Sequence, residues 1–168
     1  MPGTVRDMRS RVSAGLLLYR KGHGLLEVFL AHPGGPFFTR KDEGHWTIPK
    51  GEVERGEELL MTAIREFQEE IGMSIDPRSE FIELGSIRQK GGKIVHAWAV
   101  EGDRDDTFPI LSVTFKMEWP PGSGQMQKFP EIDRAQFFPL VQARRKIKET
   151  QIPLLDRLEE TLAQRPNG

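Results

Sequence analysis

The strongest constraint in this sequence is the stretch from Lys50 to Met73, which predicts an amphipathic helix over 57–71. At about 100° per residue, its apolar side chains gather into one stripe, as is typical of a helix that docks on a core with one side. The stripe consists of Leu60, Ala63, Ile64, Phe67 and Ile71. Beside it, Glu66, Glu69 and Glu70 share roughly a third of the circumference. The sequence therefore predicts a helix with one buried stripe and an acidic face turned outward.

The residues around this helix carry the signals of helix ends. Gly51 and Gly56 loosen the backbone before it. We expect Glu57 and Glu58 in the first turn, where the helix dipole favours negative charge. Gly72 follows the last apolar residue, as a glycine at a helix C-terminus does. The stretch is predicted to be a loop, a helix and a loop.

Two interpretations of the acidic face follow from the residues alone. Carboxylates held close together repel one another, which costs stability unless a cation lies between them. Oxygen ligands of this kind suit Mg²⁺ or Mn²⁺, which keep several waters and bind substrate phosphates as well. The alternative is a merely solvated surface, which is the usual state of a run of charges. The spacing of the whole stretch favours the metal site.

The fixed residues from Gly51 to Met73 resemble the signature of the Nudix hydrolase family. That signature runs Gly, five residues, Glu, seven residues, Arg-Glu, an apolar residue, any residue, Glu-Glu, any residue, Gly and an apolar residue. The chain matches it without departure at Gly51, Glu57, Arg65, Glu66, Phe67, Glu69, Glu70, Gly72 and Met73. A chance match at the seven fixed residues has a frequency of about 10⁻⁸ per window.

The resemblance implies a fold, a reaction and a cofactor. The fold is α/β, the Nudix α/β/α sandwich around a mixed β-sheet, and the reaction is hydrolysis of a nucleoside diphosphate linked to another moiety. The cofactor is Mg²⁺ (or Mn²⁺). Candidate metal ligands are Glu66, Glu69, Glu70, Glu57, Glu131 and the backbone carbonyl of Gly51. Candidate catalytic residues are Glu66, Arg65 and Glu69, with Glu69 either a ligand or the general base and Arg65 a brace for the carboxylates.

The run at 45–51, HWTIPKG, leads into the signature. Its Pro-Lys-Gly sequence resembles that of diadenosine polyphosphate hydrolases within the family, and it favours a dinucleoside polyphosphate or a nucleoside triphosphate as substrate. Lys50 is a candidate phosphate ligand, against the alternative of a solvated lysine. We expect Trp46 to face the core with Ile48, and Trp46 is also a candidate substrate contact. The alternative function is a non-catalytic Nudix-like module that senses a nucleotide.

Length and composition limit what the whole chain can be. Its 168 residues suffice for one domain with a real core, so we predict a single domain over 1–168 with a loose lead-in at 1–11. The net charge of -1 gives no global attraction to nucleic acid or to an anionic membrane. The absence of cysteine excludes disulfides, thiolate metal sites and a cysteine nucleophile. No export signal or anchor is visible, which favours a cytoplasmic location, and the oligomeric state stays open.

The rest of the chain alternates between strands and turns. Hairpins are predicted from strands at 13–20 with 25–32 and at 81–89 with 93–100. A further half-buried strand is expected at 112–119, followed by a mobile loop at 120–127 and by Glu131 as a metal ligand, a base or an ordinary surface acid. His96 lies in a predicted strand, and we expect it to pack in the core or at an edge rather than to act as a catalytic base. An amphipathic C-terminal helix is predicted from Leu154, Leu155, Leu158 and Leu162.

Overall fold

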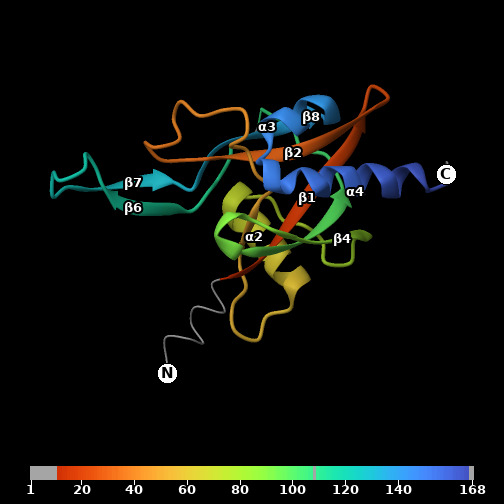
Figure 1. The fold of residues 1–168 in the computed structure, drawn as a ribbon, viewed down its shortest axis with the longest axis horizontal. Helices are drawn as coiled ribbons and strands as arrows, with labels where there is room; N and C mark the ends of the chain where they lie inside the picture. Colours follow the sequence, from red (N-terminus) through yellow and green to blue (C-terminus); the bar gives the residue numbers. More distant parts are fainter. Residues whose placement is uncertain (1–10, 108, 167–168) are drawn as a thin grey trace.

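The computed structural model describes residues 11–107 and 109–166. Figure 1 shows the elements along the chain. The strands are β1 (Val12–Gly22), β2 (Leu25–Pro33), β3 (Lys50–Glu52), β4 (Phe81–Arg88), β5 (Ile94–Glu101), β6 (Thr114–Glu118), β7 (Met126–Pro130) and β8 (Ile132–Pro139). The helices are α2 (Leu59–Ile71), α3 (Leu140–Lys146) and α4 (Ile152–Ala163), with short 3₁₀ turns at Lys90–Gly92 and Glu149–Gln151. Both predicted hairpins and the C-terminal helix are confirmed.

The main sheet is mixed, with the strand order β4, β5, β1, β2, β8 and with β3 beside the start of β1. β1 and β5 run parallel, and Leu16 lies opposite Trp98. The other neighbouring pairs in this sheet are antiparallel. Parallel pairing needs a long crossover, and the chain between β1 and β5 supplies α2 for it. The predicted α/β class and mixed sheet are therefore confirmed.

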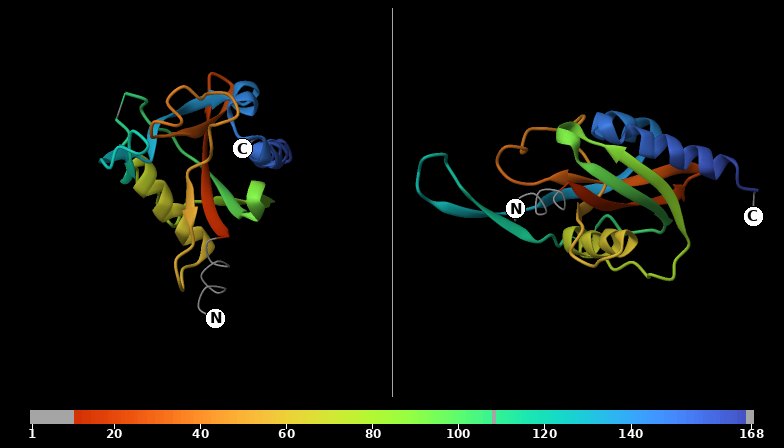
Figure 2. Two further views of the ribbon diagram at one scale, coloured as in Figure 1. Left: turned by 60° about the vertical axis from the view of Figure 1, so that its left-hand side comes forward. Right: turned by 60° about the horizontal axis from the view of Figure 1, so that its bottom comes forward.

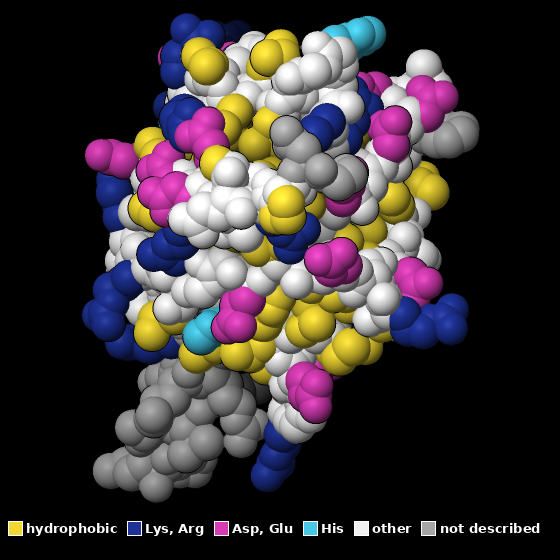
Figure 3. All heavy atoms as spheres, turned by 90° about the vertical axis from the view of Figure 1, so that its right-hand side faces the viewer, with side chains coloured by type: hydrophobic (Ala, Val, Ile, Leu, Met, Phe, Trp, Pro, Cys, Tyr) yellow, Lys and Arg dark blue, Asp and Glu magenta, His cyan; other side chains and the backbone are white. Residues whose placement is uncertain are grey.

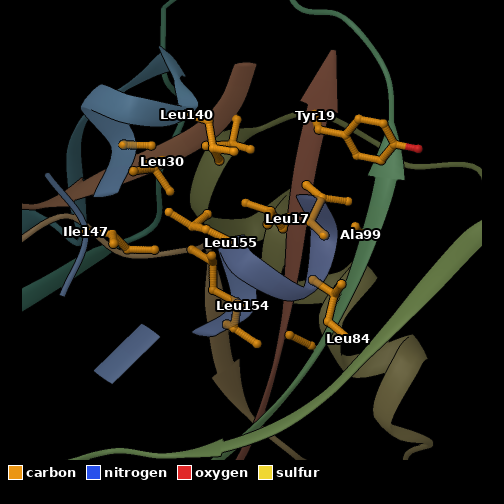
Figure 4. Close-up of a cluster of buried hydrophobic side chains, with 14 of the residues drawn as sticks. Leu17, Tyr19, Leu30, Leu84, Ala99, Leu140, Ile147, Leu154 and Leu155 are labelled. Atoms are coloured by element: carbon orange, nitrogen blue, oxygen red, sulfur yellow. The ribbon is translucent and has the colours of Figure 1, made fainter. Parts of the chain in front are cut away.

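Alternation along β1 builds two cores, one on each face of the sheet. Leu17 and Tyr19 point to one face and Leu16 and Leu18 to the other, and all four are buried. α3 and α4 cover the first face, where Figure 4 shows leucines of α4 pointing toward β1. α2 covers the second face, so the sheet lies between helices (Figure 2). This is the sandwich that the family resemblance implies.

β6 and β7 form a separate two-stranded sheet that projects from the body (Figure 1). The strand expected at 112–119 is present at Thr114–Glu118, but its apolar side chains do not cover the main core, and Val113 is 45% exposed. The end of the segment predicted as a mobile loop at 120–127 belongs to β7, because Met126 and Gln127 pair with Glu118 and Met117. That prediction was wrong for these two residues.

The start of one helix differs from the sequence prediction, and one predicted segment lies almost wholly outside the described residues. α2 begins at Leu59 rather than at Glu57, and Glu58 is the residue before its first turn. Except for its last residue, the lead-in predicted at 1–11 lies outside the described residues. Among the described residues, no helix is long and apolar enough to cross a bilayer. On the face in Figure 3, acidic and basic side chains are interspersed.

Candidate active site

α2 is fixed on the sheet by its apolar stripe, and this fixes the direction of its acids. Ala63, Phe67 and Ile71 are almost fully buried against the second core. Gly72 ends the helix at φ 83°, a left-handed conformation that glycine adopts without strain, and its N–H donates to the carbonyl of Gln68. The helix therefore has one rotational setting about its axis, and in that setting Glu66 and Glu70 face β3.

The backbone of β3 meets these two carboxylates directly. A Cβ atom at Gly51 would lie 2.0 Å from the Glu66 carboxyl carbon, so only glycine leaves room for this side chain. The Lys50 N–H donates to Glu70 Oε2 at 3.3 Å. Gly51 and Lys50 thus place β3 against the acidic face of α2.

Arg65 holds the neighbouring acids together. Its Nε donates to Glu57 Oε2 at 2.8 Å and its Nη2 to Glu57 Oε1 at 3.0 Å. Its Nη1 donates to Glu66 Oε1 at 2.9 Å and to the Glu69 carboxylate at 3.2 Å. One guanidinium therefore donates hydrogen bonds to three carboxylates, and the role of Arg65 as a brace for them stays a prediction.

The acids differ in the environment that sets their pKa values. Burial, then repulsion from Glu66, raises the pKa of Glu70 to about 8. Burial also raises the pKa of Glu66, and the charge of Arg65 opposes this effect. Hydrogen bonds from Arg65 lower the pKa of Glu57 to about 2. The protein alone therefore places too little positive charge beside Glu66 and Glu70 to offset their burial. Arg65 already neutralises Glu57.

Backbone hydrogen bonds hold Glu131 near the acidic face of α2. The N–H of Val113 donates to the carbonyl of Glu69 at 3.0 Å, and the carbonyl of Val113 accepts the N–H of Glu131 at 2.9 Å. The charge of Glu131 contributes to the raised pKa of both Glu66 and Glu70. The residue before β8 is thus tied to the C-terminal end of α2, which brings a further carboxylate to the site.

These residues fit a hard divalent cation in their chemistry. Their donors are carboxylate oxygens and backbone carbonyls, the ligands that Mg²⁺ and Mn²⁺ prefer. The raised pKa values of Glu66 and Glu70 identify where a cation lowers the free energy most. Over residues 11–107 and 109–166, however, no three acidic or histidine side chains are arranged around one ion. Binding of one ion by three of them therefore requires side-chain rotation.

A separate cavity of about 460 Å³ has two lysines, Lys90 and Lys148, in its lining. It is lined by Gly44, His45, Gln89, Lys90, Lys148, Glu149 and Thr150. Burial and then the charge of Lys148 lower the pKa of Lys50, and Lys93 has the same effect on Lys148 after burial. Cationic side chains from three separate segments therefore lie close together, a setting that favours an anion. Lys148 had no signal in the sequence, because only folding brings it near Lys50.

Trp46 does not have the surface that a substrate contact needs. Its side chain is 2% exposed, its ring packs edge-on against Phe138, and its Nε1 donates to Asp42 at 2.8 Å. The expectation that Trp46 faces the core is confirmed, and we withdraw it as a substrate contact. The Lys50 N–H donates to Glu70, and the charge of Lys148, which lines the cavity, acts on the Lys50 side chain, so Lys50 stays a candidate.

Comparison with known proteins agrees with this geometry. The profile of the NUDIX domain matches residues 9–158. Asymmetrical bis(5'-nucleosyl)-tetraphosphatases are 40% identical over 62 residues in Caenorhabditis elegans and 42% over 64 residues in Rattus norvegicus. Those matches cover 37% and 34% of this chain and 41% and 42% of the relatives, so the chain matches about two fifths of the length of these relatives.

Solved structures extend the similarity over most of the chain. A C. elegans Ap4A hydrolase in a binary complex has a TM-score of 0.64 at 25% identity, over 91% of this chain and 99% of its own. The NUDIX domain of Shewanella oneidensis NrtR, complexed with ADP ribose, has a TM-score of 0.60 at 16% identity, over 90% of this chain and 87% of its own. This second likeness concerns the fold alone. With the domain profile matched across nearly its whole length, this chain belongs to the Nudix family.

Proposed function

We propose that this protein is a metal-dependent hydrolase that cleaves the pyrophosphate linkage of a nucleoside diphosphate joined to another moiety. One observation carries the proposal: two carboxylates lie partly or largely buried against Gly51 in β3, and the charge of Lys148, which lines the cavity, acts on the neighbouring Lys50. Glu66 and Glu70 need a cation there, and a bound Mg²⁺ attracts the pyrophosphate that the lysines of the cavity also attract.

Each side chain has a part in the proposed reaction. Glu66, Glu70 and the carbonyl of Gly51 would hold Mg²⁺ or Mn²⁺, with Glu69, Glu131 and Glu57 as further candidates. The metal, when bound, polarises the phosphate and lowers the pKa of a water. Glu69 is 42% exposed, so solvent reaches its carboxylate and it can take the proton of the attacking water. Arg65 holds the carboxylates of Glu57, Glu66 and Glu69 in place, and Lys50 orients the phosphate.

The substrate proposed is a dinucleoside polyphosphate or a nucleoside triphosphate. The relatives named asymmetrical bis(5'-nucleosyl)-tetraphosphatase and Ap4A hydrolase support the first of these. Lys90 and Lys148 line the cavity, and Lys50 lies beside it, which suits a chain of more than two phosphates. A substrate with a single pyrophosphate would leave part of this positive charge unused.

The test is hydrolysis of a panel of diadenosine polyphosphates, nucleoside triphosphates, nucleotide sugars and ADP-ribose, with and without Mg²⁺. Glu66→Gln is compared with Glu83→Gln, an exposed glutamate on β4, as the matched control. We expect wild type and the control to cleave the polyphosphates, and Glu66→Gln to lose at least about 100-fold in kcat. A folded Glu66→Gln variant with wild-type activity contradicts the proposal. Saturable nucleotide binding without cleavage by the wild type replaces it with the sensor function.

A further inference from the structure

Gln151, the last residue of the 3₁₀ turn before α4, is fully buried, and both ends of its side-chain amide are hydrogen-bonded. Its Oε1 accepts the N–H of Ile48 at 3.0 Å. Its Nε2 donates to Thr47 Oγ1 at 2.8 Å and to Gln89 Oε1 at 2.9 Å. Gln151 therefore joins the start of α4 to the run before β3 and to the residue after β4.

These partners fix the direction in which each amide faces. A backbone N–H only donates, so the atom of Gln151 that meets Ile48 is the oxygen. The nitrogen of Gln151 has two hydrogens, and Thr47 and Gln89 accept one each. The atom of Gln89 that meets this nitrogen has to be an acceptor, so it is the oxygen. The NH₂ group of Gln89 therefore faces away from Gln151.

The NH₂ group of Gln89 is available to a ligand in the cavity. In the described part of the chain, no group accepts a hydrogen bond from it, and no side-chain nitrogen or oxygen is both buried and unpartnered, so solvent reaches it. Gln89 lines the cavity together with Lys90, Lys148 and Glu149. Two ammonium groups against one carboxylate give this lining a positive balance, which favours an anionic ligand.

We propose that Gln89 donates a hydrogen bond to a phosphate oxygen of the substrate in this cavity, and that Gln151 is the positioning residue that keeps the NH₂ group of Gln89 turned toward that oxygen. An amide turned the other way would present its own oxygen, which repels an anion. This inference rests on the proposed function, because it places the polyphosphate in the cavity. Binding of a phosphate chain does not require its hydrolysis, so the two can fail separately.

The first experiment follows the side-chain amide signals of ¹⁵N-labelled protein by NMR while inorganic tripolyphosphate is added, in EDTA and in Mg²⁺. Gln89→Met assigns the signal of Gln89 by removing it. We expect this signal to shift saturably, while that of Gln164, exposed at the end of α4, stays in place. A Gln89 signal that does not shift in either condition overturns the proposal, whether or not the protein hydrolyses anything.

Hydrogen exchange of the same amides in the free wild type tests the orientation without any variant. Both amide hydrogens of Gln151 are buried and hydrogen-bonded, so we expect them to exchange slowly with solvent. The amide hydrogens of Gln89 should exchange fast. Any other order of the two rates overturns the positioning role of Gln151.

The second experiment measures KM and kcat for Gln89→Met and Gln151→Met. Loss of a hydrogen bond to a charged oxygen should raise KM by about 10-fold in Gln89→Met, with kcat changed less than about twofold. Gln151→Met leaves the Gln89 amide able to turn, so a smaller share of the protein is ready to bind, and KM should rise about two- to tenfold. In the Gln89→Met background, Gln151→Met should add little, because it acts through Gln89.

Arg157→Met is the matched control. Arg157 also joins α4 to β4, because its Nη1 donates to the carbonyls of Leu84 and Ser86 at 2.9 Å each, and it is not among the residues that line the cavity. Its KM should match that of the wild type. An equal rise of KM in Arg157→Met and Gln151→Met, or full additivity of Gln151→Met with Gln89→Met, overturns the positioning role.

Discussion

A single methyl group at Gly51 should disable the site without unfolding the chain. Gly51 pairs with Ala14 in the sheet, and its φ lies outside the left-handed region, so alanine can adopt the same backbone. The methyl group would lie 2.0 Å from the carboxyl carbon of Glu66 and 2.2 Å and 2.4 Å from its oxygens. Gly51→Ala therefore acts on the position of one carboxylate.

The expected size of the effect follows from that overlap. Ordinary contact begins at 3.4 Å, so the Glu66 carboxyl group has to move by about 1.4 Å. A displacement of about 1 Å in a catalytic arrangement can cost about 100-fold in rate. Stability should not fall in parallel, because replacing a compatible glycine by alanine stabilises by about 0.4–1 kcal/mol through the unfolded chain. We expect kcat to fall by about 100-fold while Tm stays within a few degrees of the wild type.

The assay is phosphate release from a dinucleoside polyphosphate at saturating Mg²⁺, together with thermal unfolding. Gly22→Ala is the matched control, because its methyl group would also meet a carboxylate, 2.6 Å from Glu27 Oε1, far along β1 from the site. The control should keep its kcat. A Gly51→Ala protein with wild-type kcat would refute the assignment of Glu66, and one that fails to fold would refute the local nature of the contact.

Three further predictions concern pH, the arginine brace and the core. The pKa of Glu70 is raised from 4.5 to about 8, so the metal-free folded state keeps this proton over a range where the unfolded state has lost it. Its free energy of unfolding should therefore fall as pH rises from 4.5 to 8, less so in Glu70→Gln, as denaturant titrations in EDTA can measure. Arg65→Lys should lower kcat by about 10- to 100-fold, because an ammonium cannot make the paired contacts with Glu57; steady-state kinetics would show it. Leu155→Ala, at a fully buried site, should cost about 2–5 kcal/mol in urea unfolding and leave kcat intact.

Local pattern was enough to predict the elements that build the site. The apolar stripe of α2 and the glycine after it depend on residues within one or two turns of each other, and the structure places Phe67 and Ile71 in the core as expected. The same holds for both hairpins and for the leucines of α4. The contact of Arg65 with Glu57 also joins neighbours along the chain, so it could be anticipated.

Contacts between distant segments could not be predicted from local pattern. The parallel pairing of β1 with β5 depends on the crossover, which no alternation along either strand encodes. Lys148 lies near Lys50 because α3 returns over the sheet, and His32 meets Asp133 because β2 and β8 are neighbours. The end of the segment at 120–127 lacks the apolar alternation of a buried strand because β7 pairs outside the main core, so local pattern predicts a loop there.

The most direct test of the central claim is the dependence of kcat on free Mg²⁺, measured with diadenosine tetraphosphate for the wild type and for Glu66→Gln. If the acidic face of α2 holds the metal that drives hydrolysis, wild-type kcat rises from zero in EDTA to saturation. Glu66→Gln then needs more Mg²⁺ and reaches at most about a hundredth of the wild-type rate. Cleavage by the wild type in EDTA, or equal Mg²⁺ dependence of the two proteins, would contradict the account.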